Sequence, residues 1–164
     1  MNGFSHSKER MMPEDLYTKL KTLLEQEISR TEYEIKELVK KRAELEGPKV
    51  SKSSHDLQDN EEEVYIKQLL LKDYQEKLQS IEAIKERSGG ETAEEGAMVK
   101  LKFLTDQSTQ DFILINGPGG KVGEFTLLST KTPVGKATIG KKTGERVVIQ
   151  TPGGEAEIEI LSVI

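Results

Sequence analysis

Residues 24–48 read LEQEISRTEYEIKELVKKRAELEGP. Seven positions of this stretch follow one another at alternating intervals of four and three residues: Leu24, Ile28, Thr31, Ile35, Leu38, Arg42 and Leu45. Such alternation is the heptad pattern of a helix that packs lengthwise against another helix. Pro13 suits the first helical position, and a helix does not continue through Gly47 and Pro48, so we expect one long helix between these points.

A second heptad helix follows after a short polar segment. We expect it to begin between Asp56 and Asn60 and to run to about Arg87, with a seam formed by Val64, Leu71, Tyr74, Leu78 and Ile81. Two heptad helices of similar length in this order predict an antiparallel coiled-coil hairpin over residues 13–88, with its tip at about 47–60. Residues 1–12 are expected to form a flexible tail.

The composition changes near Ser88, Gly89 and Gly90, after which glycine and β-branched residues become frequent. We expect a linker at 89–96 and a small β-rich domain at 97–164. The predicted strands are Met98–Leu104, Asp111–Asn116, Glu124–Leu128, Arg146–Gln150 and Ala156–Val163. Turns are predicted at 117–120 and 151–154, and a short helix from Pro133 to Ile139 ends at Gly140. The expected fold class is α+β, with a helical hairpin followed by an antiparallel sheet and one short helix.

Composition limits the class of protein. Of the 164 residues, 34% are hydrophobic and 32% are charged, which favours an elongated, well-solvated shape over one deep core. The absence of cysteine excludes disulfides, zinc-thiolate sites and thiol nucleophiles. No signal peptide or membrane segment is evident, so we expect a soluble, cytoplasmic protein without membrane contact. A net charge of −5 argues against broad binding to the nucleic-acid backbone.

Residues 55–65, HDLQDNEEEVY, contain the candidate site. Asp56 and Asp59 are three residues apart, so their carboxylates would share one face in the opening turn of a helix. Such a pair could help to hold Mg²⁺, which uses one or two carboxylates together with water and phosphate oxygens. The alternative is that these acids only stabilise the helix start, with Asp56 as the N-cap residue. From composition alone, the second interpretation is the stronger one.

Two parts of the sequence resemble the Gre family of bacterial transcript cleavage factors. The stretch DLQDNEE at 56–62 is similar to the family's tip motif Asp-Leu-x-Glu-Asn-x-Glu, with Asp59 in place of Glu and His55 where Gly is common. The stretch STKTPVGKATIGKKTGERVVIQTPGGEAEIEILSVI at 129–164 is similar to the family's closing segment. Residues 47–54 look like an insertion relative to the family.

The resemblance implies a partner, a cofactor and a site. Gre factors dock on bacterial RNA polymerase through the β-rich domain, whose fold is FKBP-like, and insert the hairpin through the secondary channel. Asp56 and Asp59 would then be catalytic and metal-binding residues in the partner's active site, sharing Mg²⁺ with the polymerase while it cleaves backtracked RNA. The implied polymerase-binding residues are Thr132, Pro133, Val134, Gly135 and Lys136. The factor would be a monomer, would contact the nascent RNA 3′ end only indirectly, and would catalyse nothing alone.

Other functions stay open. The shorter side chain of Asp59 and the insertion before the tip are compatible with a regulator that occupies the channel and inhibits or modulates the polymerase without promoting cleavage. A prolyl isomerase would need an aromatic-lined pocket, whereas the only aromatic residues of the β-rich half are Phe103, Phe112 and Phe125. A coiled-coil adaptor is compatible with the heptads but does not explain the C-terminal resemblance.

Overall fold

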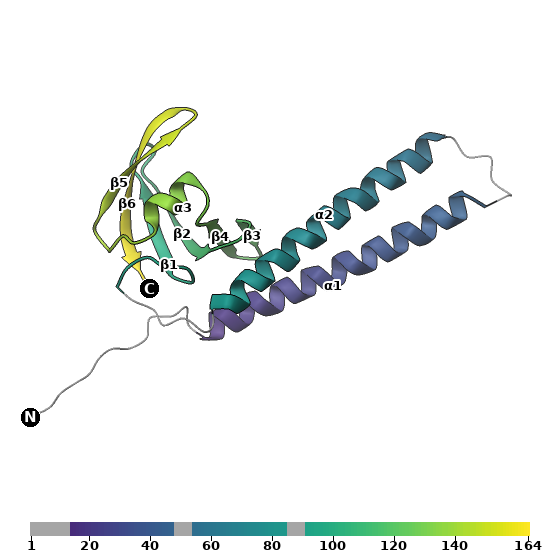
Figure 1. Ribbon diagram of the computed structural model, residues 1–164, viewed down its shortest axis with the longest axis horizontal. Coiled ribbons are helices and arrows are strands. Elements are labelled where there is room, and N and C mark those ends of the chain that lie inside the picture. Colours follow the sequence, from purple (N-terminus) through teal and green to yellow (C-terminus); the bar gives the residue numbers. More distant parts are fainter. Residues whose placement is uncertain (1–13, 48–53, 85–90) are drawn as a thin grey trace, which may run out of the picture.

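The computed structural model describes residues 14–47, 54–84 and 91–164. Its first two elements are long helices, α1 (Glu14–Leu45) and α2 (Ser54–Ile84), which run antiparallel along each other and project from a small β-rich domain (Figure 1). The predicted hairpin is therefore confirmed. α2 begins at Ser54, before the predicted range, and serine is a favoured residue at helix starts. The expected tail, the segment 48–53 and the expected helix end near Arg87 lie outside the described residues.

The seam between the two helices is buried or half-buried at every predicted heptad position of α1 and α2. Asn60 and Lys67 also belong to the α2 seam, although the prediction counted mainly apolar residues there and omitted both. The outer part of the seam therefore contains polar residues among apolar ones such as Leu38 and Leu45, whereas near the β-rich domain Leu20, Leu24 and Ile81 are fully buried. None of the helices in the described part of the chain is long and apolar enough to cross a membrane.

The β-rich domain consists of a six-stranded sheet and one short helix. The strands are β1 (Met98–Phe103), β2 (Ser108–Ile115), β3 (Gly120–Val122), β4 (Phe125–Ser129), β5 (Arg146–Thr151) and β6 (Gly154–Val163). Their order across the sheet is β3-β4-β2-β1-β6-β5. The helix α3 (Pro133–Thr138) follows β4. The α+β class is confirmed, and each predicted strand has a counterpart with shifted ends.

Two features of the sheet differ from the prediction. Gly120 belongs to β3 and not to a turn, because this strand is so short that no apolar alternation marks it in the sequence. β4 pairs with β2 in parallel, whereas an antiparallel sheet was predicted. The chain reverses at both ends of β3, which pairs antiparallel with β4 at the sheet edge, so β4 returns in the direction of β2.

Each face of the sheet contributes to a separate apolar core. Alternate residues of β2 point to opposite faces, so that Ile113 and Ile115 belong to one core and Leu114 to the other. The second core includes Val134 and Ala137 of α3 at its margin. The first core joins the sheet to the base of the hairpin; its helical members are Tyr17, Leu20, Leu24, Ile81 and Ile84. The hairpin and the β-rich domain therefore share one core.

Three glycines allow the hairpin base and the β-rich domain to approach closely. A Cβ atom added at Gly117 would lie 2.2 Å from Ser80 Oγ, one at Gly96 2.1 Å from Ile84 Cγ2, and one at Gly123 2.8 Å from Leu23 Cδ1. Non-bonded carbon atoms pack best at roughly 3.5–4.0 Å, so none of these places admits a side chain without movement. An ion pair of 2.6 Å between Lys19 Nζ and Glu124 Oε1 spans the same junction.

Residues 91–96, which fall in the predicted linker 89–96, are built into the β-rich domain. Ala93 is fully buried, and its amide donates to Lys141 O at 2.7 Å. The amide of Gly96 donates to Leu114 O, also at 2.7 Å. The domain therefore begins before the first predicted strand.

Candidate functional site at the hairpin tip

Asp56 and Asp59 lie in the first turns of α2, at the end of the hairpin that points away from the β-rich domain (Figure 1). Both side chains are exposed. Since α2 already begins at Ser54, Asp56 is inside the first turn and is not the N-cap residue that the sequence suggested. Acids in this turn still favour the positive end of the helix. The sequence therefore placed the two carboxylates correctly at the free end.

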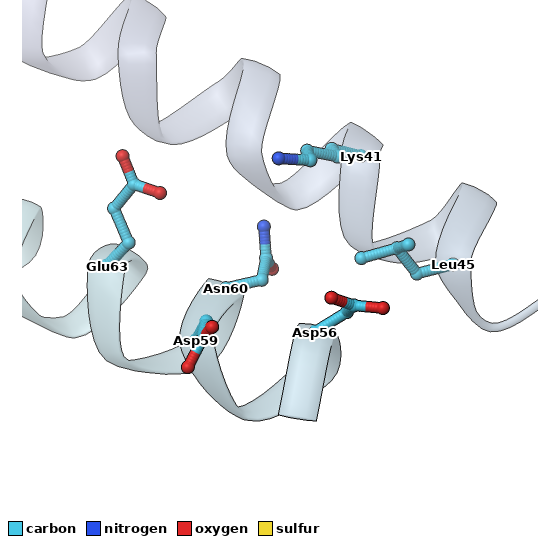
Figure 2. A pocket seen from close by; sticks show the side chains of 6 residues that line it. All are labelled: Lys41, Leu45, Asp56, Asp59, Asn60 and Glu63. Carbon is cyan, nitrogen blue, oxygen red and sulfur yellow. The ribbon is translucent and has the colours of Figure 1, made fainter. Parts of the chain in front are cut away.

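The two aspartates border one open cavity of about 320 Å³ between the helices. Its lining residues are Lys41 and Leu45 of α1 and Asp56, Asp59, Asn60 and Glu63 of α2 (Figure 2). The carboxylate of Asp56 is directed toward Leu45, whereas that of Asp59 is turned away from α1 (Figure 2). The predicted shared face is therefore present, but the two carboxylates leave it in different directions.

The carboxylate of Asp59 has a neighbour within its own helix. His55 Nδ1 lies 3.1 Å from Asp59 Oδ1, and both side chains are largely exposed. When the imidazole is protonated this contact is an ion pair between residues four apart, a spacing that brings side chains together on a helix. The partner of Asp59 in this structure is thus the residue that stands where the Gre family commonly has glycine.

Asn60 is a buried polar residue of the site, with only 4% of its surface exposed. Its Nδ2 donates to the backbone oxygen of Leu38 across the hairpin at 3.2 Å. Its Oδ1 has no hydrogen-bond partner among the described residues. The family motif contains Asn60, and a step of four residues back from Val64 also reaches this position, but the predicted seam omitted it.

Basic residues of α1 reach the same end of the hairpin. Lys41 lines the cavity, and its ammonium group is directed toward Asn60 and Glu63 (Figure 2). Arg42 is held by two acids, with Glu46 Oε1 at 2.9 Å and Glu61 Oε1 at 2.7 Å. The tip therefore combines acidic and basic groups, and the acids of α2 do not all face solvent alone.

Within residues 14–47, 54–84 and 91–164, no three His, Cys, Asp or Glu side chains are grouped so that they could hold a metal ion. Asp56 and Asp59, which border the same open cavity, are the candidates for a metal shared with a partner. Such sharing suits Mg²⁺, because this ion is usually bound through one or two carboxylates and keeps several other oxygen ligands.

The five residues implied in partner binding form the start of α3. Thr132 is its N-cap residue: its hydroxyl accepts from Gly135 N at 3.1 Å and donates to Ser129 O at 2.8 Å. Gly135 is buried, and the half-buried Val134 packs against the second core. Pro133 and Lys136 are exposed. Of the five, these two present their side chains at the surface, while the others build the helix.

A second cavity, of about 600 Å³, lies beside this helix. Its lining residues are Glu94, Glu95, Thr130, Lys136 and Ile139. Ile139 is an exposed apolar residue. The surface next to α3 therefore extends beyond the five predicted residues and includes both charges and an apolar contact point.

Residues 88–164 match the family model described as "Transcription elongation factor, GreA/GreB, C-term". This part of the chain is therefore similar to the C-terminal domain of GreA/GreB factors. The transcription elongation factor GreA of Bacillus cytotoxicus is 38% identical over 68 residues, which are 42% of this chain and 42% of that protein. GreA of Yersinia pestis is 39% identical over 70 residues, again 42% of each chain. The matched region thus spans less than half of these GreA proteins. The resemblance noted in the C-terminal sequence is confirmed.

A likeness also exists to the crystal structure of GreA factor homolog 1 of Thermus thermophilus. It has a TM-score of 0.38 and 20% identity, and it covers 88% of this chain and 94% of that one.

Proposed function

We propose that this chain is a Gre-type elongation factor of bacterial RNA polymerase that stimulates Mg²⁺-dependent cleavage of backtracked RNA. In this proposal the GreA/GreB C-terminal domain docks on the polymerase, and the hairpin enters the secondary channel. The chain is a cytoplasmic monomer and is not an enzyme by itself, because the reaction takes place in the active site of its partner.

The observation that carries this proposal is the position of Asp56 and Asp59. They are exposed carboxylates at the far end of two helices, and the other end of those helices shares a core with the GreA/GreB domain. Helix α1 has 32 residues and is about 48 Å long at 1.5 Å per residue, so the hairpin can carry these carboxylates deep into a partner.

The chemistry assigned to the tip is limited to what these residues can do. Asp56 and Asp59 would supply carboxylate oxygens to the shared ion and would orient the attacking water by accepting its hydrogen bond. When bound, Mg²⁺ would stabilise the charge on the attacking and leaving oxygens of the phosphodiester. The seam residues and the GreA/GreB domain would hold the carboxylates in place, and small misplacements matter: about 1 Å can lower a rate about a hundredfold.

The test uses stalled elongation complexes of a bacterial RNA polymerase with labelled RNA and Mg²⁺. Wild-type protein should shorten the RNA from its 3′ end. The double variant Asp56→Asn, Asp59→Asn should lose this stimulation while its circular dichroism and binding to the polymerase stay unchanged. Glu76→Gln is the matched control, because Glu76 is an exposed acid of the same helix that lies outside the motif at 56–62 and does not line the cavity. A double variant that cleaves as well as wild type would contradict the assignment.

A second candidate is a regulator that occupies the channel without promoting cleavage. The contact between His55 and Asp59 favours it, because a carboxylate held by a neighbouring imidazole is less available to a metal ion. The same assay separates the two candidates. The regulator would inhibit elongation or compete with another channel ligand, and it would leave the RNA full-length in Mg²⁺.

A further inference from the structure

The seam of the hairpin has one buried amide close to the candidate site. Asn60 occupies a heptad position of α2, between Asp59 and the run of glutamates, and its side chain points into the seam. Its Nδ2 donates to Leu38 O, and its Oδ1 has no partner among the described residues. A residue chosen only to stabilise the seam would be apolar, because a buried polar atom without a hydrogen bond is unfavourable.

The other links between the helices in this region are more exposed. Lys67 Nζ lies 2.5 Å from Glu34 Oε2, and both side chains are about one-third exposed. Arg42 Nη2 lies 2.7 Å from Glu61 Oε1, with roughly half of each side chain exposed. Long charged side chains can keep such pairs after a small slide of one helix, and exposed pairs contribute little. The amide of Asn60 is short and buried, so it tolerates far less movement.

We propose that Asn60 fixes the register of α2 against α1 near the free end and thereby sets where Asp56 and Asp59 stand. The importance of those aspartates rests on the function proposed above; the register does not. Asn60 is a positioning residue, because it acts through the helix and not on a substrate. A single buried asparagine in a coiled-coil seam specifies register at some loss of stability, and this matches an amide with one satisfied and one unsatisfied end.

The apolar contacts between the helices fix the register less firmly near the tip than at the base. The fully buried leucines and isoleucine lie at the base. Further out, the polar residues Thr31, Arg42, Asn60 and Lys67 stand among apolar residues that are mostly only half-buried. A slide of α2 by one turn would move Asp56 and Asp59 along the hairpin by about 5.4 Å. It would also separate Asn60 Nδ2 from Leu38 O and leave both ends of a buried amide unsatisfied. Replacing Asn60 by leucine removes that penalty and permits the alternative register.

Distances between spin labels test the register directly. The chain has no cysteine, so Glu32→Cys and Glu62→Cys, both at exposed positions, can be labelled selectively. Glu32 lies on the base side of the pair Glu34–Lys67 and Glu62 lies toward the tip, so a slide along the axis changes their separation. The wild-type seam should give one narrow distance. Asn60→Leu should give a second or shifted distance, displaced by several ångströms, with an unchanged or higher melting temperature.

Thr31→Val is the matched control. Thr31 is likewise a buried polar seam residue, but its hydroxyl donates only to Glu27 O of its own helix. This variant should keep the single wild-type distance and wild-type cleavage, whereas Asn60→Leu should lose about a hundredfold in cleavage despite its stability. A single unchanged distance in Asn60→Leu would overturn the register proposal. If wild-type protein itself promotes no cleavage, the proposed function fails, and the distances still decide the register.

Discussion

The junction between hairpin and β-rich domain depends on the missing side chain of Gly117. In Gly117→Ala the new Cβ would lie 2.2 Å from Ser80 Oγ and 3.1 Å from Ser80 Cβ. Restoring an ordinary contact requires a separation of about 1 Å, since non-bonded atoms pack at roughly 3.5 Å. Overpacking of this kind costs about 1–3 kcal/mol. For a protein of this size each kcal/mol lowers the melting temperature by about 2–4 °C.

The assay is thermal unfolding followed by circular dichroism, with two companion variants. Gly153→Ala is the matched control, because Gly153 is not in the left-handed region and its added Cβ would have no atom closer than 3.8 Å; we expect a change within about 0.5 kcal/mol. Ser80→Ala removes the nearest obstructing atom, so Gly117→Ala should lose at least half of its effect in that background. Equal penalties in both backgrounds would refute the steric explanation, as would a Gly117→Ala protein that melts like Gly153→Ala.

Two further predictions concern the GreA/GreB domain and the seam. Gly135→Ala should lower the unfolding free energy in urea by more than about 3 kcal/mol, because its Cβ would lie 2.0 Å from the backbone atom Ser129 O; stability equal to that of Gly153→Ala would contradict this. The hydrogen bond from Lys67 lowers the pKa of Glu34 below its ordinary value of 4.5, against the opposing effect of burial. A carboxyl with a lowered pKa stabilises the folded protein above its unfolded pKa and loses this effect as pH falls. Glu34→Gln should therefore melt below wild type at pH 7 and like wild type in acid, and a difference that persists in acid would contradict the role of this pair.

The hairpin could be predicted from the sequence because heptads are a local signal that extends over many residues. The α2 seam was incomplete for a physical reason: Asn60 and Lys67 are polar residues that are usually exposed, and only the facing helix provides their partners Leu38 O and Glu34. The short strand β3 left no pattern, because three residues are too few to establish an alternation.

The glycines at the junction illustrate a second limit of prediction from the sequence. Gly96 has a φ of 90°, which glycine adopts without steric cost, and glycines in turns commonly have this conformation. A need for glycine of this kind can be suspected from the local sequence. The need for glycine at Gly117 comes instead from Ser80, which lies 37 positions earlier in the chain and on another element. At the tip, the residue types and the place of Asp56 and Asp59 followed from the motif, but the directions of their carboxylates depend on His55 and on the facing helix.

Because the hairpin is long, a small change in packing at the junction displaces the tip. Suppose that the hairpin and the β-rich domain move apart by about 1 Å at Gly117. If their interface is about as wide as one helix diameter, roughly 10 Å, the hairpin tilts by about 0.1 radian. From Ser80 to Asp56, which are 24 residues or about 36 Å apart along α2, that tilt moves the free end by about 4 Å. Local register errors near Asn60 act on the same carboxylates over a similar distance. The shared core, the close glycine contacts and the buried amide therefore all help to keep Asp56 and Asp59 in position. In a hairpin of this length, a small movement at the base becomes a larger displacement of these two residues.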